Sequence, residues 1–293
     1  MNSVLTEMLK KYQAESLFDK KNAVKEVMQE LVLCALSRTG FFKHAAFYGG
    51  TALRIFYGLD RFSEDLDFSL MKPDPEFELA GYFPSLKKEL ASYGLNVEIS
   101  EKHKTKESPV RSAFLKGNTK EHILLFYASD SAAEKIAGDE MIKIKFEVDT
   151  NLPDGAKFEH KYRLLPSPYE IALYDMSSLF AGKAHAVICR AWKSRVKGRD
   201  LYDYIFCLSR ETTLNIEHLK ARLVQSEAWK AENKFTIDDA KKLLCERFDS
   251  IDYEQAKNDV RPFVKDTAAL EIWNADFFKQ ITNELKSSDI PKE

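Results

Sequence analysis

Two glycines at the end of a short apolar run constrain the fold of this chain more than any other feature of its sequence. Residues 45–48 read Ala-Ala-Phe-Tyr, which favours a buried strand, and Gly49 and Gly50 follow directly. Residues 51–56 contain no helix breaker and predict a helix. A strand that passes through glycines into a helix can hold phosphate, because the glycine backbone can approach a ligand closely and the N–H groups of the first helical turn are unpaired.

Two aspartates follow this helix after a short spacer. Asp65 and Asp67 lie in an alternating segment, so both carboxylates project from the same face of the predicted strand. Paired carboxylate oxygens suit Mg²⁺. A Gly-Gly turn or a pair of surface acids is common when it occurs alone, but together they combine a phosphate cradle with a cation site. Nucleotidyl transfer needs this combination, because a metal bridging the phosphate oxygens neutralises the charge that develops on them.

The clearest two-residue alternation in the chain occurs at residues 141–150. Its polar face carries Lys143, Lys145, Glu147 and Asp149. An edge strand of an antiparallel sheet would show the same pattern. An enzyme built on Asp65 and Asp67, however, requires a further acid to complete the metal shell or to take the proton from an attacking hydroxyl. The alternation leaves Glu147 and Asp149 as equal candidates for this third carboxylate.

A second group of charged residues lies near residue 190. Lys183 and Arg190 are two helical turns apart on one face of a predicted helix. Gly198 then interrupts the pattern, and the next predicted helix carries Asp200 and Asp203 one turn apart. A solvated helix face is the usual explanation for such charges. The alternative is that the lysine acts as a point charge at a phosphate site.

The two blocks together resemble a known family. Gly-Gly-Thr-x-Leu-Arg at 49–54, followed by Arg-x-Ser-x-Asp-x-Asp-Phe at 61–68, is similar to the nucleotidyltransferase signature of the polymerase-beta-like superfamily. In its full form it resembles the AbiEii/AbiGii toxin family. Lys183 and the run Arg199-Asp200-Leu-Tyr-Asp203 resemble the second block of that family. The resemblance implies an α/β fold, with a polymerase-beta-like lobe built on a mixed sheet and a C-terminal helical lobe.

The resemblance also implies a role for each motif residue. It assigns nucleotide binding to Gly49, Gly50, Thr51, Arg54, Ser63, Lys183 and Arg190. It assigns Mg²⁺ binding to Asp65, Asp67 and Glu147, and it thereby favours Glu147 over Asp149. The catalytic residues would be these three acids with Lys183 and Asp200. Lys183 would neutralise the triphosphate, and Asp200 would orient it or hold the site together.

The implied function is that of a toxin from a bacterial toxin–antitoxin or phage-abortive-infection pair. Such an enzyme would use Mg²⁺ to transfer a nucleoside monophosphate from a nucleoside triphosphate (NTP) to the 3′ end of tRNA, which would block translation. Its partners would be the NTP, tRNA and a cognate antitoxin protein. Two other functions share the same motifs, namely AMP transfer to a protein or small molecule, and nucleotide-dependent regulation without turnover. AMP transfer to a protein would not need a basic surface for nucleic acid.

Composition limits where a nucleic acid could bind. Lys and Arg (44) nearly balance Asp and Glu (46), giving a net charge of −2, so an RNA partner requires a local basic patch. The densest basic stretch is 183–199, which includes Trp192, Lys193 and Arg195. The Lys-rich residues 102–106 are a second candidate, although a solvated loop is the simpler explanation for them.

Helix-breaking residues predict the lobe boundary, and the spacing of the cysteines bears on the cellular location of the protein. Prolines and a glycine at 151–167 mark a boundary between a nucleotidyltransferase lobe at 1–160 and a helical lobe at 161–293 that closes over the nucleotide. The four cysteines are widely spaced and include no Cys-x-x-Cys pair. No apolar run reaches the ~18 residues of a membrane-spanning helix. We therefore expect a cytoplasmic protein with no membrane role.

Periodicity predicts the remaining elements. Helices are expected at 4–38 and 77–93, and strands at 95–99, 112–115 and 122–127. From Pro166 onward the pattern predicts helices almost exclusively.

Overall fold

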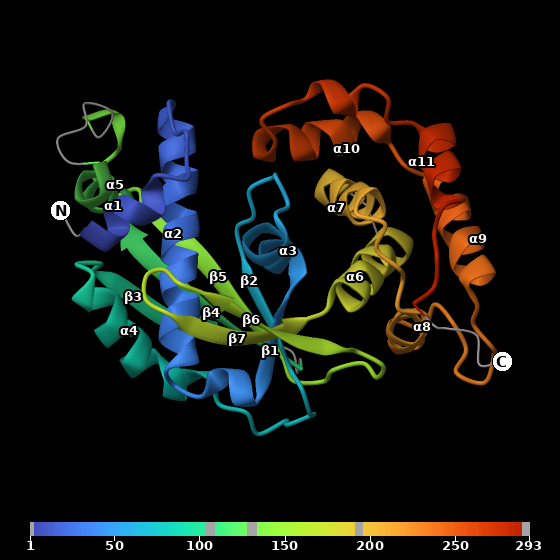
Figure 1. Ribbon diagram of the computed structural model, residues 1–293, viewed down its shortest axis with the longest axis horizontal. Helices are drawn as coiled ribbons and strands as arrows, with labels where there is room; N and C mark the ends of the chain where they lie inside the picture. The colour runs from blue at the N-terminus through green and yellow to red at the C-terminus, as the bar shows by residue number, and fades with distance from the viewer. Residues whose placement is uncertain (1–2, 103–108, 128–133, 191–195, 289–293) are drawn as a thin grey trace. The chain divides into compact units, whose positions relative to one another are not determined.

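A computed structural model describes the chain except for residues 1–2, 103–108, 128–133, 191–195 and 289–293 (Figure 1). The chain divides into two compact units. Unit 1 comprises Met1–Phe56, Phe62–Leu152 and His160–Leu173. Unit 2 comprises Tyr57–Arg61, Pro153–Glu159 and Tyr174–Glu293. Each unit has its own core and is described by itself.

A seven-stranded mixed sheet organises unit 1, with the strand order β3-β4-β5-β2-β1-β7-β6. The strands are β1 (Ala45–Tyr48), β2 (Leu66–Leu70), β3 (Val97–Lys102), β4 (Val110–Asn118), β5 (Met141–Asp149), β6 (Phe158–Arg163) and β7 (Tyr169–Tyr174). β2 lies antiparallel to β1 and parallel to β5, whereas β1 lies parallel to β7. This arrangement confirms the expected α/β fold with a mixed sheet.

Helices cover the apolar face of this sheet. They are α1 (Ser3–Leu9), α2 (Leu17–Ser37), α3 (Gly49–Tyr57), α4 (Phe83–Ser92) and α5 (Thr119–Tyr127), with short 3-10 turns at Phe41–Lys43 and Leu79–Tyr82. α2 begins at a capping box in which Ser16 and Asp19 satisfy each other's backbone N–H groups. It contacts β5 as well as α1, α4 and α5, and Figure 1 shows it crossing the strands. α2 therefore packs on the sheet at β5 and joins three other helices of unit 1.

Four phenylalanine rings fix the register of the central strands. Phe68 of β2 packs against Phe41, Phe47 and Phe146, with ring centroids 5.0, 5.1 and 4.9 Å away. All four rings are buried. Because neighbouring residues of a strand point to opposite faces, burying Phe68 and Phe146 on the helix-covered side directs Asp67 and Glu147 to the other side.

Unit 2 is largely helical. Its helices are α6 (Met176–Cys189), α7 (Gly198–Ser209), α8 (Ile216–Gln225), α9 (Ile237–Phe248), α10 (Tyr253–Val260) and α11 (Ala275–Thr282), with 3-10 turns at Arg261–Phe263 and Ala268–Leu270. α6 contacts α7, α8 and α9, and the buried rings of Phe180, Tyr204, Phe248 and Phe278 form a continuous core. The Tyr204 hydroxyl lies 2.7 Å from Thr282 Oγ1, which ties α7 to α11.

Two expectations about secondary structure are wrong. Residues 122–127 belong to α5 and not to a strand, and residues 169–174 form strand β7 although helices were expected from Pro166 onward. In α5 the buried residues are Thr119, His122, Ile123 and Phe126, which is helical spacing. In β7 the side chains at 169 and 171–174 are all buried, and an apolar run this short fits a buried strand or a helix equally well.

Candidate active site

The sheet register places two of the predicted carboxylates side by side. Asp67 of β2 pairs with Glu147 of the parallel strand β5, and one step further along the same two strands Ser69 pairs with Asp149. Paired residues of adjacent strands project from the same face, so Glu147 flanks Asp67. The Asp149 carboxylate instead accepts a hydrogen bond from the N–H of Asn151, at 2.9 Å. Between the two acids that the alternation left open, the geometry favours Glu147.

Gly49 brings the backbone into contact with this acidic face. Its neighbour Tyr48 pairs with Asp67 across β1 and β2. Gly49 has φ of 85°, and a Cβ added there would lie 2.6 Å from Asp67 Oδ2. Any other residue would therefore be strained and would collide with the carboxylate. Gly49 also starts α3, so the unpaired N–H groups of the helix begin next to Asp67.

Thr51 and Ser63 connect α3 to the segment that carries Asp65. The Thr51 side chain is buried, and its hydroxyl lies 2.9 Å from Ser63 Oγ and also contacts the backbone carbonyl oxygen of Asp65. Both hydroxyls thus hold the loop before β2 in place. This is a structural contact that does not depend on a bound nucleotide.

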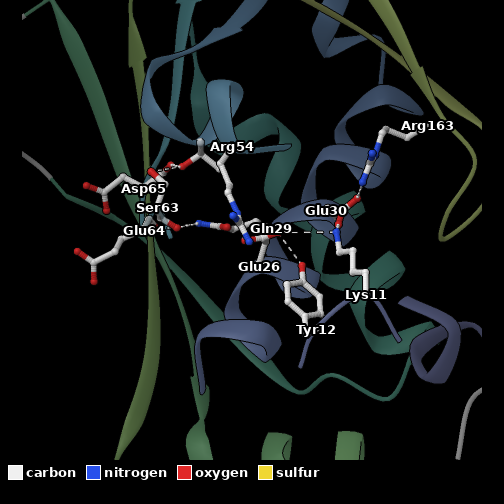
Figure 2. A network of polar contacts seen from close by, with 11 residues as sticks. Lys11, Tyr12, Glu26, Gln29, Glu30, Arg54, Ser63, Glu64, Asp65 and Arg163 are labelled. Atoms are coloured by element: carbon white, nitrogen blue, oxygen red, sulfur yellow. Dashed lines mark hydrogen bonds and ion pairs between the residues drawn. The ribbon is translucent and has the colours of Figure 1, made fainter. Parts of the chain in front are cut away.

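Gln29 of α2 binds the backbone of the same loop. Its side-chain nitrogen donates hydrogen bonds to the carbonyl oxygens of Ser63 and Glu64, at 3.1 and 2.9 Å, and the side chain is fully buried (Figure 2). Two buried acids of α2 flank Gln29, namely Glu26 one helical turn before it and Glu30 directly after it. Glu26 accepts hydrogen bonds from Tyr12 and Arg54, and Glu30 is bound by Lys11 and Arg163. Figure 2 shows that these contacts form one network reaching from α2 to the loop.

Arg54 belongs to this network. Its Nε donates to Glu26 Oε2 at 2.8 Å, and its guanidinium lies 4.9 Å from the centre of the Phe62 ring. Arg54 of α3 thus pairs with a buried acid of α2. A role for Arg54 in nucleotide binding remains a prediction from the motif.

Lys145 sits within the acidic face. Its Nζ lies 2.6 Å from Glu147 Oε2, and Ser112 donates to the other carboxylate oxygen of Glu147 at 2.8 Å. Burial alone would lower the pKa of Lys145. The negative charges of Glu147, Asp65 and Asp67 outweigh burial, so the pKa is raised above its usual value. The pKa of Asp65 is raised above its usual value, mainly by desolvation. The positive charges of Lys145 and Lys25 oppose this rise, whereas the negative charges of Glu64 and Glu147 add to it. The ammonium and the carboxylates therefore form one electrostatic group.

The chemistry of these acids fits a magnesium ion. Asp65, Asp67 and Glu147 offer only oxygen ligands, which Mg²⁺ prefers, and Asp67 and Glu147 lie in register beside the Gly49 backbone. As the side chains stand, however, no three His, Cys, Asp or Glu residues in the described part of the chain gather closely enough to hold an ion. One oxygen of Glu147 is instead bound by Lys145. The donor set fits Mg²⁺, and its assignment as a metal site remains a prediction.

In unit 2 the charged residues of the second motif block contact one another, with Asp203 at the centre. The Asp203 carboxylate is fully buried and receives two hydrogen bonds of 2.6 Å from Arg61, while Lys183 Nζ lies 2.7 Å from Oδ2. Burial would raise the pKa of Asp203, but Arg61 and Lys183 lower it below its usual value. Asp200 forms an ion pair with Arg190 at 3.1 Å and lies 3.9 Å from Lys183.

Sequence reasoning did not assign four of the residues that support these groups. It gave no role to Gln29, Lys145 or Arg61, and it left Asp203 open between a functional residue and a solvated charge. Two of them carried a visible signal, because Lys145 shares the polar face of its strand with Glu147, and Asp203 lies one turn after Asp200. Nothing in the local pattern pairs Gln29 with residue 63, since their contact spans 34 positions.

The expected basic patch is only partly described. Trp192, Lys193 and Arg195 lie outside the described residues, as do His103, Lys104 and Lys106. Arg199 pairs with Asp259 at 3.6 Å and stacks over Phe263. In the described residues, no helix is both long and apolar enough to cross a membrane.

A family profile matches most of the chain. The profile of the family described as nucleotidyl transferase AbiEii toxin, type IV toxin–antitoxin system, matches residues 31–280. No curated protein sequence matches the chain. A crystal structure of a candidate nucleotidyltransferase from H. pylori has 19% identity and a TM-score of 0.44, covering 87% of this chain and 88% of that one. The crystal structure of JHP933 from Helicobacter pylori has 18% identity and the same TM-score, with 88% and 87% covered.

Proposed function

The chain belongs to the AbiEii family of nucleotidyl transferase toxins, and from this premise we propose that it transfers a nucleoside monophosphate from an NTP to the 3′ end of tRNA. The protein is a nucleotidyltransferase by family, and its substrate includes an NTP. Membership of a toxin–antitoxin family also implies an antitoxin partner. The tRNA acceptor, the use of Mg²⁺ and a cytoplasmic site of action are our proposals.

One observation carries the assignment of the active site within unit 1. Asp67 and Glu147 are register partners on the face of the sheet opposite the buried rings of Phe68 and Phe146, and the Gly49 backbone adjoins Asp67. We assign Asp65, Asp67 and Glu147 to the metal, and the first turn of α3 to the phosphates. When bound, Mg²⁺ would supply positive charge to the phosphate oxygens.

The reaction joins the acceptor to the α-phosphorus of the NTP. The oxygen of the tRNA 3′ terminal hydroxyl forms a bond to that phosphorus, and the bond from the phosphorus to the bridging oxygen of the β-phosphate breaks, releasing pyrophosphate. A carboxylate oxygen of Glu147 is proposed to accept the hydroxyl proton. Lys183 is proposed to neutralise phosphate charge, with Asp203 and Asp200 fixing its position.

A transfer assay tests both the chemistry and the acceptor. The full chain is incubated with Mg²⁺ and each of the four NTPs labelled at the α-phosphate, in the presence of tRNA, of candidate proteins, or of neither. We expect label on tRNA. Label on protein would instead support AMP-type transfer to protein, and NTP binding with no transfer would support a regulatory module.

Matched variants test the site itself. Asp65→Asn, Asp67→Asn and Glu147→Gln should each lower the transfer rate about 100-fold or more, because each removes a carboxylate from the reacting region. Glu64→Gln is the control, since it removes a charge from the same loop, where Glu64 pairs with Lys25. Full activity of Asp65→Asn would show that the metal site is misplaced.

A further inference from the structure

The ammonium group of Lys145 lies among the acids on the polar face of strand β5. Lys145 lies two residues before Glu147 on β5, so both side chains project from the same face. The Leu66–Phe146 pair of β2 and β5 places Asp65 and Lys145 at the same step along these strands, each one residue before that pair. Lys145 thus stands level with Asp65 and next to the register pair of Asp67 and Glu147.

The contacts of Glu147 show what the ammonium does there. One carboxylate oxygen is bound by Lys145 Nζ at 2.6 Å and the other accepts from Ser112 at 2.8 Å. The lysine side chain is about one-third exposed, at 34%, and that of Glu147 is 23% exposed, so water screens their attraction only in part. Glu147 is therefore held by a cation of the chain itself.

A metal ion would need the same carboxylate. A divalent cation beside Glu147 would repel the ammonium of Lys145, since two positive charges would share one oxygen. The lysine would then have to turn away, and the free energy of its contact with Glu147 would be subtracted from that of metal binding.

We propose that Lys145 is the built-in counterion of this acidic face, which positions Glu147 when metal is absent and lowers metal affinity by competing for the same carboxylate. This inference rests on the proposed function, because it takes Asp65, Asp67 and Glu147 as the metal ligands. Lys145 is a positioning residue here, acting through Glu147.

Removing the ammonium tests this competition. The full-length chain, stripped of metal with a chelator, is titrated with Mn²⁺ as the probe, and free Mn²⁺ is followed by electron paramagnetic resonance. Lys145→Met should bind Mn²⁺ about two- to fivefold more tightly than the wild type, the range expected for losing one partly screened ion pair. Lys145→Arg keeps a positive charge and should remain near the wild-type affinity.

Lys143→Met is the matched control. Lys143 lies on the same face of the same strand, two residues before Lys145, and is exposed to solvent. Its replacement removes the same charge by the same change of side chain, and the Mn²⁺ affinity should stay close to that of the wild type.

Thermal unfolding gives a second readout that needs no activity. In chelator, Lys145→Met should unfold about 2–4 °C below the wild type, because the acids then repel one another without a counterion. Saturating Mn²⁺ should close this gap. Lys143→Met should show neither effect.

The outcomes distinguish the counterion role of Lys145 from the assignment of the metal site. Equal Mn²⁺ affinity of Lys145→Met and wild type would overturn the counterion role and leave the metal assignment standing. An equal gain in affinity for Lys143→Met would reduce the effect to general surface charge and would also overturn it. If the folded wild type and every variant failed to bind Mn²⁺, the metal assignment in the proposed function would itself fail.

Discussion

At the scale of single residues, Gly49 is a position where both the backbone conformation and the available space exclude a side chain. Its φ of 85° disfavours any side chain, and a Cβ would lie 2.6 Å from Asp67 Oδ2. Gly49→Ala should therefore destabilise the protein by about 1 kcal/mol or more. It should also lower the transfer rate about 100-fold, because the Asp67 carboxylate must move.

The control for this prediction is Gly81→Ala. Gly81 lies in the 3-10 turn Leu79–Tyr82, has no positive φ, and has no atom within 4 Å of an added Cβ. Transfer rates and urea unfolding of both variants provide the measurement. If Gly49→Ala were as active as Gly81→Ala, the Gly49 backbone would have no part in the site.

A second residue-scale prediction concerns Asp203. Its carboxylate neutralises Arg61 and Lys183 inside unit 2, so Asp203→Asn would leave buried positive charge without a partner. We expect a loss of about 3–5 kcal/mol at pH 7. Asp238→Asn, which removes an exposed charge from α9, is the control and should cost less than about 1 kcal/mol.

The pH dependence of this loss follows from the lowered pKa of Asp203. A lowered folded-state pKa means that the carboxylate contributes fully above the unfolded-state value of about 3.9, and that the contribution is lost as the pH falls through the folded-state value. The difference between wild type and Asp203→Asn in urea unfolding should therefore be constant from pH 7 to about pH 5 and shrink below pH 4. A difference that grew on acidification would contradict the assignment.

At the scale of elements, α2 determines the shape of the loop before β2. Gln29 satisfies the carbonyl oxygens of Ser63 and Glu64, so Gln29→Leu would leave two acceptors without this donor. We expect a loss of about 1–3 kcal/mol in stability. Hydrogen exchange of residues 59–70 should become faster, and the transfer rate should fall with little change in KM for the NTP, because the loop positions Asp65.

Asn22→Leu is the control on the same helix. The side-chain nitrogen of Asn22 is buried and has no hydrogen-bond partner among the described residues, so its removal should leave hydrogen exchange of residues 59–70 unchanged. Equal acceleration by both variants would indicate a general loosening of α2 and not a specific support by Gln29.

Some helices and strands could be predicted from local sequence patterns and others could not. The strand at residues 45–48, the helix after Gly49 and the strand 141–149 follow from local alternation and breakers, and the structure confirms them. Residues 169–174 escape this reasoning, because β7 is defined by its position between β1 and β6 and not by its own periodicity. The alternation placed Glu147 and Asp149 alike on the polar face, the family resemblance favoured Glu147, and the register adds that Glu147 pairs with Asp67.

At the scale of the whole molecule, one sequence motif serves both units. Ser63, Asp65 and Asp67 belong to unit 1, whereas Arg61, two residues before Ser63, belongs to unit 2 and binds Asp203 there. A continuous motif can therefore hold residues with separate partners. For this reason the roles of Arg61 and Asp203 became visible only from their contacts, although both lie within the motif blocks.

The division into units leads to a prediction about metal binding and unfolding. The three tryptophans, at positions 192, 229 and 273, all fall in the Tyr174–Glu293 segment of unit 2, whereas the proposed metal ligands lie in unit 1. Units with separate cores can unfold in separate transitions. Mg²⁺ without nucleotide should therefore stabilise β2 and β5 by about 2.7 kcal/mol at a hundredfold excess over its Kd, and leave the tryptophan transition in place.

Urea unfolding measures this difference when tryptophan fluorescence is compared with hydrogen exchange of β2 and β5 peptides. Asp67→Asn should abolish the Mg²⁺-dependent shift in those peptides, because it removes a proposed ligand without changing unit 2. Equal shifts of the fluorescence and exchange midpoints would mean that the units unfold together or that Mg²⁺ binds unit 2. The Asp67→Asn variant separates these cases, since a shift that survives the substitution must come from a site other than the acidic face of the sheet.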